Sequence, residues 1–461
     1  MNKPIVVLGV APTKRGFLSM EEAKRQKDKF MAAIRAVKPE SVRIVDIDGI
    51  CENGILFERD KISPVVEKFK DARIDALFLP HCDFGEEQCA AGVAAALKVP
   101  TLIWGPRDER PNTDEGRGRD TQCGMFACTK VLRRFGVTYS YIWNCETESE
   151  DFRRGFERFI RVAAVVKTVK TLRVAKFGAR PQPFMSVTAN EGDLCTNLGA
   201  TVIPISPNAV AARADQLQKE ASQEYAACRE EFKSRFDTER TPEEKVDRIA
   251  ALKLAVKQLM EENDCTAGAM ECWSAASIFG APVCAVLGEL SDMGLPLACE
   301  TDVNGAVTMA MLHAAALGEQ SVFLADLTIR HPANDNAELL WHCGPFPYSL
   351  KDPASAAGLA DGQERFALKK GDITLCRFDE ADGAYYLFGG EGRAVEGPET
   401  TGTYVWFEAD NWKRWEEKLM FGPYIHHIGG VYGNYKPVLR EAARYLGLIF
   451  DDAEQQGIYS L

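Results

Sequence analysis

The first third of the chain alternates short apolar runs with segments whose apolar residues recur every three to four positions. Buried parallel strands give continuous apolar runs, whereas amphipathic helices give a period of about 3.6 residues. The runs predict strands at 4–10, 42–48, 75–81 and 100–105, and the periodic segments predict helices at 19–37, 62–72 and 86–98. This alternation is typical of a doubly wound parallel sheet, so we expect an α/β domain over residues 1–165.

The same alternation continues in the middle of the chain. A charged helix predicted at 150–172 leads into apolar strands beginning at 173 and 201. A long polar helical region at 208–262 follows these strands. The stretch 295–331 predicts an apolar strand, an Ala/Met-rich helix and a second apolar strand. We therefore expect a second Rossmann-like α/β domain over residues 166–345.

After about residue 345 the pattern changes. Short β-rich runs alternate with Gly/Asp turns at 365–398, which predicts antiparallel strands and a small barrel. A helix and a last apolar segment close the chain at 436–450. The third predicted domain is a smaller antiparallel β-barrel domain over 346–461. Three domains suit 461 residues, which are too many for one hydrophobic core.

Composition and charge exclude several classes of protein. The net charge of −12 argues against a nucleic-acid or anionic-membrane partner. No apolar run approaches the ~18 residues that span a bilayer, and the apolar run at 5–10 is too short for a signal peptide, so we expect a cytoplasmic protein. The 14 cysteines are scattered without a CxxC pair, which favours buried, reduced thiols over zinc or redox motifs.

Two acids stand at the ends of the apolar strands predicted within 295–331, Glu300 after the first and Asp326 after the second. A strand–helix–strand crossover returns the second strand parallel to the first, so we expect both carboxylates at one edge of one sheet, roughly 5–10 Å apart. Carboxylates that close repel unless a cation lies between them or one is protonated. A divalent metal is one solution. The alternative is helix capping, for which Asp302 or Asn304 is suited.

The six histidines supply further candidates. His426 and His427 are adjacent in a glycine-flanked segment. Adjacent side chains on an extended backbone point to opposite sides, so one imidazole can bind a metal while the other packs or contacts substrate. An imidazole among oxygen ligands favours Mn²⁺ or a similar ion. His342 is a second candidate, His313 lies among alanines and is expected to pack, and His81 either lines a cleft or is structural.

A polar loop at 106–120 follows a predicted strand end and carries Arg107, Arg110, Arg117 and Arg119. Open α/β sheets place ligand loops at that edge, so this loop either binds an anionic or hydroxylated ligand or is a solvated connection. The first domain contains neither a P-loop nor a GxGxxG motif after its first strand. Its topology therefore implies no nucleotide.

Several motifs, in this order, resemble those of the L-fucose isomerase / L-arabinose isomerase superfamily. They are ACETDVNGAVTMAML, VFLADL, WHCGP and HHIGGVYG, at 298–312, 322–327, 341–345 and 426–433. ARPQPF, ECWSA and the run 280–300 strengthen the likeness to its L-fucose isomerase-like branch. The resemblance is strongest from about 265 to 445, and over the first 165 residues it is mainly architectural.

The resemblance implies a metal-dependent aldose–ketose isomerase with two α/β domains and a C-terminal β-barrel domain. By motif, Mn²⁺ would be bound by Glu300, Asp326 and His427, the second histidine of the doublet, and the two acids would also be the acid/base pair. Moving a carbonyl from C1 to C2 through a cis-enediol requires such groups, because a proton leaves C2 and one is returned to C1. Further candidates for substrate contact are Arg15, Glu271, Trp273, His342, Trp406 and His426.

Two other functions stay open, a non-catalytic sugar-binding protein and an epimerase or lyase that uses the same enediolate. The substrate classes are a deoxy sugar, a pentose or a 6-substituted hexose, and the arginine-rich loop favours a sulfo- or phospho-sugar. The resemblance also implies a homo-oligomer, a hexamer or a related assembly, in which the first domain of a neighbouring subunit closes over the active site. Arg15 and the loop arginines would then reach the far end of the substrate.

Overall fold

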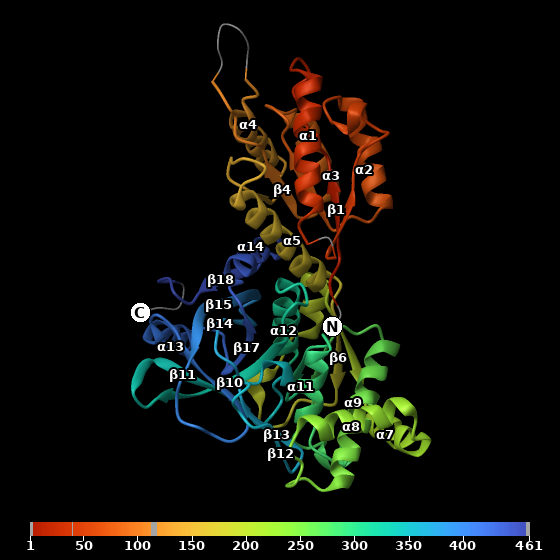
Figure 1. Ribbon diagram of the computed structural model, residues 1–461, viewed down its shortest axis with the longest axis vertical. Coiled ribbons are helices and arrows are strands. Elements are labelled where there is room, and N and C mark those ends of the chain that lie inside the picture. The colour runs from red at the N-terminus through yellow and green to blue at the C-terminus, as the bar shows by residue number, and fades with distance from the viewer. Residues whose placement is uncertain (1–2, 39, 112–117, 458–461) are drawn as a thin grey trace. The chain divides into compact units, whose positions relative to one another are not determined.

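The computed structural model describes residues 3–38, 40–111 and 118–457 (Figure 1). The chain separates into two compact units, an N-terminal unit, Pro4–Lys167, and a C-terminal unit formed by the rest of the chain. The predicted fold class is confirmed, because two parallel α/β sheets and a closed antiparallel barrel are present. Within the described residues, no helix is both long enough and apolar enough to cross a membrane.

The N-terminal unit is built on a five-stranded parallel sheet with strand order β2-β1-β3-β4-β5. Its strands are β1 (Val6–Val10), β2 (Val42–Val45), β3 (Ala76–Pro80), β4 (Thr101–Trp104) and β5 (Tyr139–Tyr141). Its helices are α1 (Met20–Arg35), α2 (Ile62–Asp71), α3 (Glu87–Leu97), α4 (Thr121–Arg134) and α5 (Glu150–Lys170), which continues past the unit boundary at Lys167. Short 3₁₀ turns lie at Glu52–Gly54 and Arg59–Lys61. Four of the five strands were predicted, whereas β5 is too short and polar to produce an apolar run.

Both faces of this sheet are covered, as the term doubly wound implies. Successive strand residues point to opposite faces, so Leu77 and Leu79 of β3 pack with the apolar faces of α2, α3 and α4. Phe78, between them, points to the other face, where it meets Phe30 of α1 and Phe156 of α5. The period-2 alternation within one short strand thus places two hydrophobic cores in the N-terminal unit.

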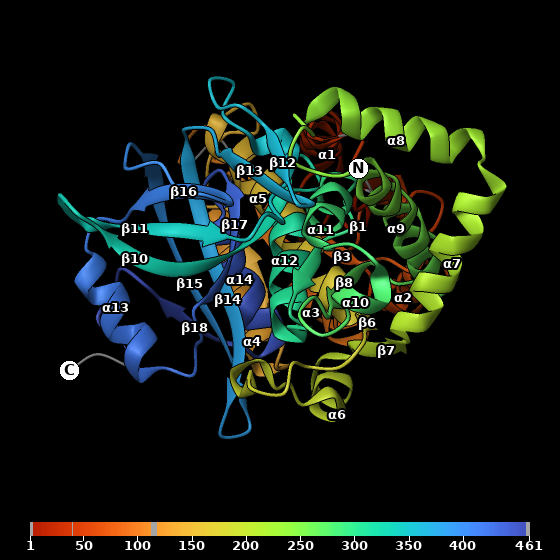
Figure 2. The same ribbon diagram turned by 90° about the horizontal axis from the view of Figure 1, so that it is seen from below.

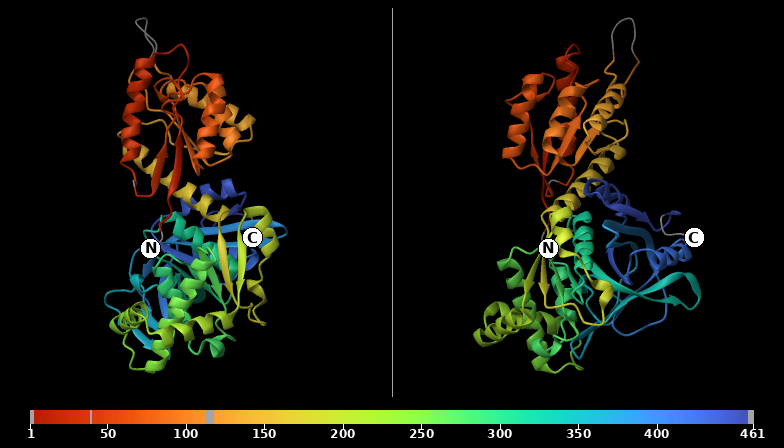
Figure 3. Two further views of the ribbon diagram at one scale, coloured as in Figure 1. Left: turned by 90° about the vertical axis from the view of Figure 1, so that its right-hand side faces the viewer. Right: turned by 180° about the vertical axis from the view of Figure 1, so that it is seen from behind.

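The C-terminal unit begins with a four-stranded parallel sheet of order β7-β6-β8-β9 (Figure 3). Its strands are β6 (Arg173–Phe177), β7 (Thr201–Ile205), β8 (Ala267–Met270) and β9 (Leu297–Cys299). The helices of this part are α6 (Glu191–Asp193), α7 (Pro207–Glu220), α8 (Gln223–Arg235), α9 (Glu243–Glu262), α10 (Ala276–Phe279), α11 (Cys284–Asp292) and α12 (Val303–Ala315), with short helical turns at Met185–Val187 and Leu194–Leu198. The helical region predicted at 208–262 therefore contains three helices.

A closed six-stranded barrel forms the remainder of the C-terminal unit. Its order is β16-β11-β10-β17-β14-β15, β15 also pairs with β16, and all six pairings are antiparallel. The barrel strands are β10 (Val322–His331), β11 (Asn334–His342), β14 (Asp372–Ala381), β15 (Ala384–Val395), β16 (Thr403–Glu408) and β17 (His427–Tyr432). The strands β12 (Gly358–Ala360), β13 (Gln363–Ala367) and β18 (Ile449–Asp452), a 3₁₀ turn (Tyr348–Leu350), α13 (Trp412–Phe421) and α14 (Lys436–Leu446) surround it.

The expectation that Glu300 and Asp326 end neighbouring strands of one sheet is wrong. Glu300 follows β9, at the edge of the parallel sheet, whereas Asp326 lies in β10 of the barrel. A tight hairpin joins β10 to β11, so β10 finds an antiparallel partner next to it in sequence instead of returning to the parallel sheet. The barrel consequently starts at Val322, well before the predicted boundary at 346.

Helix α12 explains how the two layers fit together. All 13 of its residues are buried, and it lies between the parallel sheet and the barrel strands β14 and β17 (Figure 2). A helix that is apolar on all sides belongs between two layers rather than on the surface of one sheet. This pattern was visible in the sequence, and it is the signal that argues against a simple crossover.

One barrel acid makes folding stability depend on pH. Glu338 is buried in β11, and burial together with the charge of Glu416 raises the pKa of Glu338 to about 7. Because the folded state holds this proton more tightly than the unfolded state, its stabilising contribution is present at low pH and is lost as pH rises through about 7.

We therefore expect Glu338→Gln to raise the free energy of unfolding at pH 8 by about 1–3 kcal/mol and to change it little at pH 4. Urea unfolding of both proteins at the two pH values measures this. An equal effect of the substitution at pH 4 and pH 8 would contradict the assignment.

Candidate active site

Three side chains predicted as a group meet in the C-terminal unit. Nε2 of His427 lies 3.0 Å from Oε2 of Glu300 and 3.4 Å from Oδ1 of Asp326. Two of them meet because β10 and β17 pair with Asp326 directly opposite His427. Residues opposite each other on antiparallel strands have Cβ atoms about 5 Å apart, so strand register sets this contact. The third, Glu300, reaches them from the parallel sheet.

An unusual turn after β9 carries Glu300. Glu300 and Thr301 both have φ of 59°, in the left-handed region that residues with a Cβ rarely adopt. The amide of Thr301 donates to the Met270 carbonyl at 3.1 Å, and its hydroxyl donates to the Ala179 carbonyl at 3.0 Å. Nε1 of Trp273 donates to Oε1 of Glu300 at 2.9 Å. These bonds hold a strained turn, and such strain concentrates at functional sites.

A buried ion-pair network fixes the orientation of His427. Its Nδ1 lies 2.8 Å from Oδ2 of Asp302, and both Asp302 oxygens accept from the Arg377 guanidinium, at 2.5 and 3.1 Å. Asp302 also accepts from the Gly305 amide at 2.8 Å, so it caps α12 as expected. Arg377 in turn donates to Asp379 at 3.0 Å. With Nδ1 held by a carboxylate, Nε2 faces Glu300 and Asp326, the arrangement typical of metal-binding histidines.

The sequence showed Asp302 only as a possible helix cap. Its second role depends on Arg377, which lies 75 residues further along the chain in a barrel strand. Burial opposes the charged form, yet Arg377 and His427 together hold the pKa of Asp302 well below its usual range. The one available signal was its position, two residues after Glu300 in the ACETD motif.

Two more histidines border the same acids. Nε2 of His342 and Nε2 of His426 lie 4.0 and 3.8 Å from Oδ1 of Asp326. Nδ1 of His342 accepts from the Cys343 amide at 2.9 Å. His427 is fully buried, whereas the His426 side chain is about half exposed, as expected for adjacent residues that point to opposite sides.

The electrostatics of the group favour a positive charge among the acids. Burial disfavours a charged imidazole, but the Asp302 and Glu300 carboxylates raise the pKa of His427 to about 9. Burial likewise opposes ionisation of Glu300, and the pKa of Glu300 is nevertheless lowered, chiefly by His427. The same fields that hold a proton on an imidazole here would attract a metal cation.

Unpaired polar atoms test whether these residues fit a divalent cation. Oδ1 of Asp326, Nε2 of His342 and Nε2 of His427 are buried and have no hydrogen-bond partner. A buried polar atom without a partner costs about 1–3 kcal/mol. One ligand atom each of Glu300, His342 and His427 lie within 4.8 Å of one another, and so do those of Asp326, His426 and His427. The carboxylate oxygens and imidazole nitrogens therefore fit a Mn²⁺-class ion, which would satisfy the atoms of Asp326 and His427 as its ligands.

A cavity of about 360 Å³ opens onto the acids, a volume within the range of small-molecule sites. Among its lining residues are Glu300, Asp326, Trp273 and His342. Two predicted substrate contacts, Trp273 and His342, thus lie beside the two acids.

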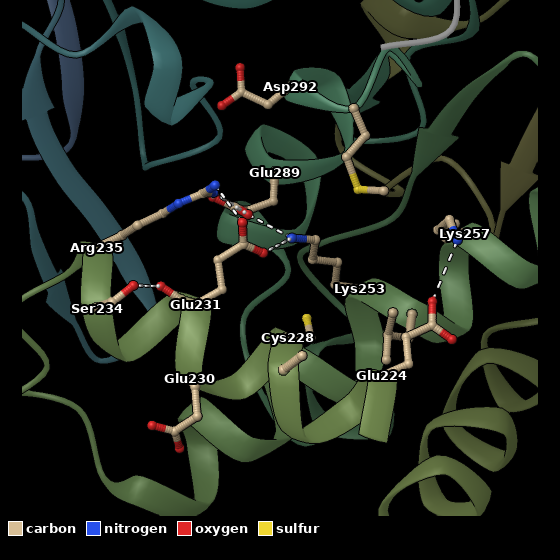
Figure 4. A pocket seen from close by; sticks show the side chains of 13 residues that line it. Glu224, Cys228, Glu230, Glu231, Ser234, Arg235, Lys253, Lys257, Glu289 and Asp292 are labelled. Atoms are coloured by element: carbon tan, nitrogen blue, oxygen red, sulfur yellow. Dashed lines mark hydrogen bonds and ion pairs between the residues drawn. The ribbon is translucent and has the colours of Figure 1, made fainter. Parts of the chain in front are cut away.

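A larger cavity of about 760 Å³ lies between α8, α9 and α11 and shares none of these lining residues (Figure 4). There the buried Glu289 pairs with Lys253 at 2.7 Å and with Arg235 at 2.9 Å (Figure 4). Its main buried charges satisfy one another, so we assign the active site to the smaller cavity.

Phe184 is a site residue that the sequence reasoning missed. Its ring stacks on Trp273, with centroids 5.7 Å apart and planes at 16°, and on His426, at 5.5 Å and 18°. It meets His427 edge-on at 5.3 Å. Phe184 ends the ARPQPF motif, which served only to support the family resemblance. No periodicity could place it, because the loop after β6 carries it to the site.

Two predicted substrate contacts lie apart from this group. The carboxylate of Glu271 accepts hydrogen bonds from the Ala179 amide, at 3.0 Å, and from the Ser274 hydroxyl, so it organises its own loop. Trp406 is buried in the barrel strand β16, and its indole N–H donates to the Pro398 carbonyl at 2.9 Å. Both side chains thus have structural partners, and their contact with substrate stays a prediction.

The other predicted contacts belong to the N-terminal unit. Arg15 pairs with Glu86 at 3.2 Å and lies over the Phe84 ring. Arg119 is buried and pairs with Glu109 at 2.8 Å, so this arginine of the loop is structural. Arg117 lies outside the described residues.

The remaining two histidine candidates are both buried. Nδ1 of His81 lies 2.9 Å from the Phe84 carbonyl, whereas its Nε2 has no hydrogen-bond partner, so both alternatives for His81 stay open. His313 lies in the buried helix α12, where packing was expected.

Comparisons with known proteins agree with this architecture. Residues 9–170 match the family model described as fucose/sulfoquinovose isomerase, N-terminal domain, and residues 357–453 match the model described as L-fucose isomerase, C-terminal domain. Together these matches cover more than half of the chain.

Curated relatives extend over most of its length. A sulfoquinovose isomerase from Priestia aryabhattai is 24% identical over 409 residues, which are 87% of this chain and 90% of the relative. Sulfoquinovose isomerases from Alkalicoccus urumqiensis and Clostridium sp. (strain MSTE9) are each 26% identical, over 70% and 81% of this chain and 73% and 85% of their own length.

The two α/β sheets, the closed barrel and these matches define an aldose–ketose sugar isomerase. The chain belongs to the L-fucose isomerase / L-arabinose isomerase superfamily, in its fucose isomerase-like branch.

Proposed function

We propose that this isomerase depends on a Mn²⁺-class cation and converts a 6-substituted aldohexose with an anionic group, such as sulfoquinovose, into its ketose. The observation that supports the metal is the convergence of Glu300, Asp326 and His427, where buried atoms of Asp326, His342 and His427 make ion-pair contacts but no hydrogen bond. The name of the relatives supports the sulfonated substrate.

The chain's own residues divide the chemistry between them. Glu300, Asp326 and His427 would hold the cation, which supplies Lewis-acid stabilisation of the enediolate oxygens. Glu300 and Asp326 approach Nε2 of His427 from the parallel sheet and from the barrel, so two carboxylates would border C1 and C2 of a bound substrate. One carboxylate would take the proton from C2, and a proton would then be returned to C1. Trp273 holds one oxygen of Glu300 and leaves the other directed at the site.

Isotope labelling tests the reaction class. Wild-type enzyme with Mn²⁺ and sulfoquinovose in D₂O should yield a ketose with deuterium at C1, followed by proton NMR. An epimerase would give a C2-epimeric aldose labelled at C2, a lyase would give fragments, and a binding protein would give no new product. Any of these three results would overturn the proposal.

A substrate panel tests the anionic group. Two carboxylates, Glu300 and Asp326, line the cavity, so an anionic substituent is expected to point away from them. We expect kcat/KM to be highest for the 6-sulfo aldose, lower for the 6-phospho sugar, and lowest for L-fucose and D-arabinose. Preference for an unsubstituted sugar would contradict this choice of substrate.

Phe184 is expected to position the substrate. A sugar presents C–H edges that suit an aromatic face, and Phe184 also fixes the Trp273 and His426 rings. Each aromatic contact contributes about 0.5–1.5 kcal/mol, so Phe184→Ala should raise KM about 3–10-fold with a smaller change in kcat. Steady-state kinetics of Phe184→Ala beside the ring-preserving Phe184→Tyr measures this. An unchanged KM in the alanine variant would exclude the role.

We also propose a homo-oligomer in which the first domain of a neighbouring subunit supplies cations to the substrate's far end. Arg15 lies after β1, at the sheet edge where α/β folds bind ligands. Arg15→Ala should raise KM for the sulfonated aldose and leave KM for an uncharged aldose unchanged. A fully active monomer in light scattering would contradict the assembly.

A further inference from the structure

Four cysteines gather at the wall of the active-site cavity as two close thiol pairs, and Cys343 of the second pair also interacts with Cys299 of the first. Sγ of Cys272 lies 3.2 Å from Sγ of Cys299, and Sγ of Cys284 lies 3.3 Å from Sγ of Cys343. The first pair follows from topology, because β8 and β9 are parallel neighbours with Met270 opposite Cys299, and Cys272 stands two residues beyond Met270. Ten of the 14 cysteines are buried as expected, but these contacts show that they are not all isolated.

The first pair continues directly into the metal-binding turn. Cys299 precedes Glu300, and one ligand atom each of Cys272, Cys299 and Glu300 lie within 4.8 Å of one another. Two thiols and a carboxylate are a ligand set for thiophilic cations such as Zn²⁺ or Cd²⁺, whereas Mn²⁺ prefers oxygen and imidazole. Sulfur atoms of a tetrahedral zinc site lie roughly 3.8 Å apart, so the pair would open by only about half an ångström.

The cavity gives a cation access to this pair. Cys272 and Glu300 line it, and Cys272 is partly exposed, whereas Cys299 is buried behind them. The strained turn at Glu300 and Thr301 brings the carboxylate within reach of both the thiols and His427. Glu300 therefore belongs to two neighbouring ligand sets, one that favours a thiophilic cation and one that favours a Mn²⁺-class cation.

We propose that Cys272, Cys299 and Glu300 form a site for a thiophilic divalent cation, and that its occupation inhibits the isomerase by withdrawing Glu300 from the catalytic metal. Each thiol releases its proton to solvent as the metal–sulfur bond forms, and no oxidant is involved. The inhibition rests on the proposed metal-dependent function, whereas binding to the thiols does not. The enzyme would thus be activated by hard cations and inhibited by soft ones at adjacent positions.

Cadmium binding to the metal-stripped enzyme tests the site without catalysis. With a phosphine reductant present, Cd²⁺ should produce a thiolate-to-cadmium absorbance in the ultraviolet that saturates at one equivalent. Cys272→Ser and Cys299→Ser should each lose at least half of it, and Cys195→Ser, at an exposed cysteine that does not line the cavity, should keep it. Thermal melts verify that the variants fold. A band kept by Cys272→Ser but lost in Cys343→Ser would move the site to the other pair and overturn the proposal, as would no band at all.

Zinc inhibition of the Mn²⁺-loaded enzyme tests the consequence. With each protein's rate scaled to its own uninhibited rate, the Zn²⁺ concentration for half inhibition should rise at least tenfold in Cys272→Ser. Equal inhibition of wild type and variant would mean that Zn²⁺ displaces Mn²⁺ directly, and would overturn the inhibitory role. A cadmium band in an enzyme without isomerase activity would refute the proposed function but support the thiol site. An active enzyme without the band would refute the thiol site but support the proposed function.

Discussion

Replacing Glu300 with Gln should reduce kcat by at least about 10³-fold. The substitution removes one charge from the ligand set and one of the two candidate bases, and acid–base catalysis alone contributes about 10²–10⁴-fold. Glutamine has nearly the same shape and can still accept the Trp273 hydrogen bond, so the turn at Glu300 should persist. Steady-state kinetics and bound metal, measured on the same preparation, check the result.

A matched control for Glu300→Gln lies one strand away. Glu271 follows β8 as Glu300 follows β9, but its carboxylate bonds within its own loop. Glu271→Gln should therefore lower kcat less than tenfold. A Glu300→Gln enzyme with full metal content and near-normal turnover would show that Glu300 is neither a ligand nor a base.

Replacing Asp302 with Asn should weaken Mn²⁺ binding and lower kcat by about 10–100-fold, the usual effect of losing the carboxylate that orients a metal-binding histidine. The asparagine side chain could still cap α12 but would carry no charge to hold His427 or balance Arg377. Arg377 would keep only Asp379 as a charged partner, and breaking a buried ion pair is destabilising, so the variant should also melt earlier.

A triple variant separates these two effects. Asp302→Asn with Arg377→Met and Asp379→Asn removes all three buried charges of this network, so stability should partly recover while Mn²⁺ affinity and kcat stay low. Metal titration by calorimetry and thermal melting give both quantities. Recovery of activity together with stability would mean that Asp302 supports the fold only and does not position His427.

The fold was predictable where the order of elements along the chain determines which strands pair. In the N-terminal unit each long apolar run became a strand, because helices between them return every strand to the same sheet. In the C-terminal unit that rule misplaced β10, because β10 pairs with β11 in a hairpin instead of joining the parallel sheet. The apolar pattern of α12 indicates a helix between two layers, but we predicted only a crossover helix from it.

Residue types and motifs were sufficient to predict which residues form the core of the site. Glu300, Asp326 and His427 do lie together, although through the pairing of β10 with β17 rather than through adjacent parallel strands. Asp302 acts on His427 through a side-chain network, and Phe184 arrives on an irregular loop. Neither spacing nor periodicity encodes such contacts, because they depend on tertiary geometry.

The central claim is that isomerisation depends on a divalent cation held by this chain's carboxylates and histidine. The most direct measurement is NMR of sulfoquinovose with enzyme stripped by a chelator, before and after Mn²⁺ is added, for wild type and Glu300→Gln. The account predicts no ketose from the stripped enzyme, ketose on adding Mn²⁺ to wild type, and none with the variant. Ketose formation at the full wild-type rate by enzyme whose metal content is below detection would contradict it.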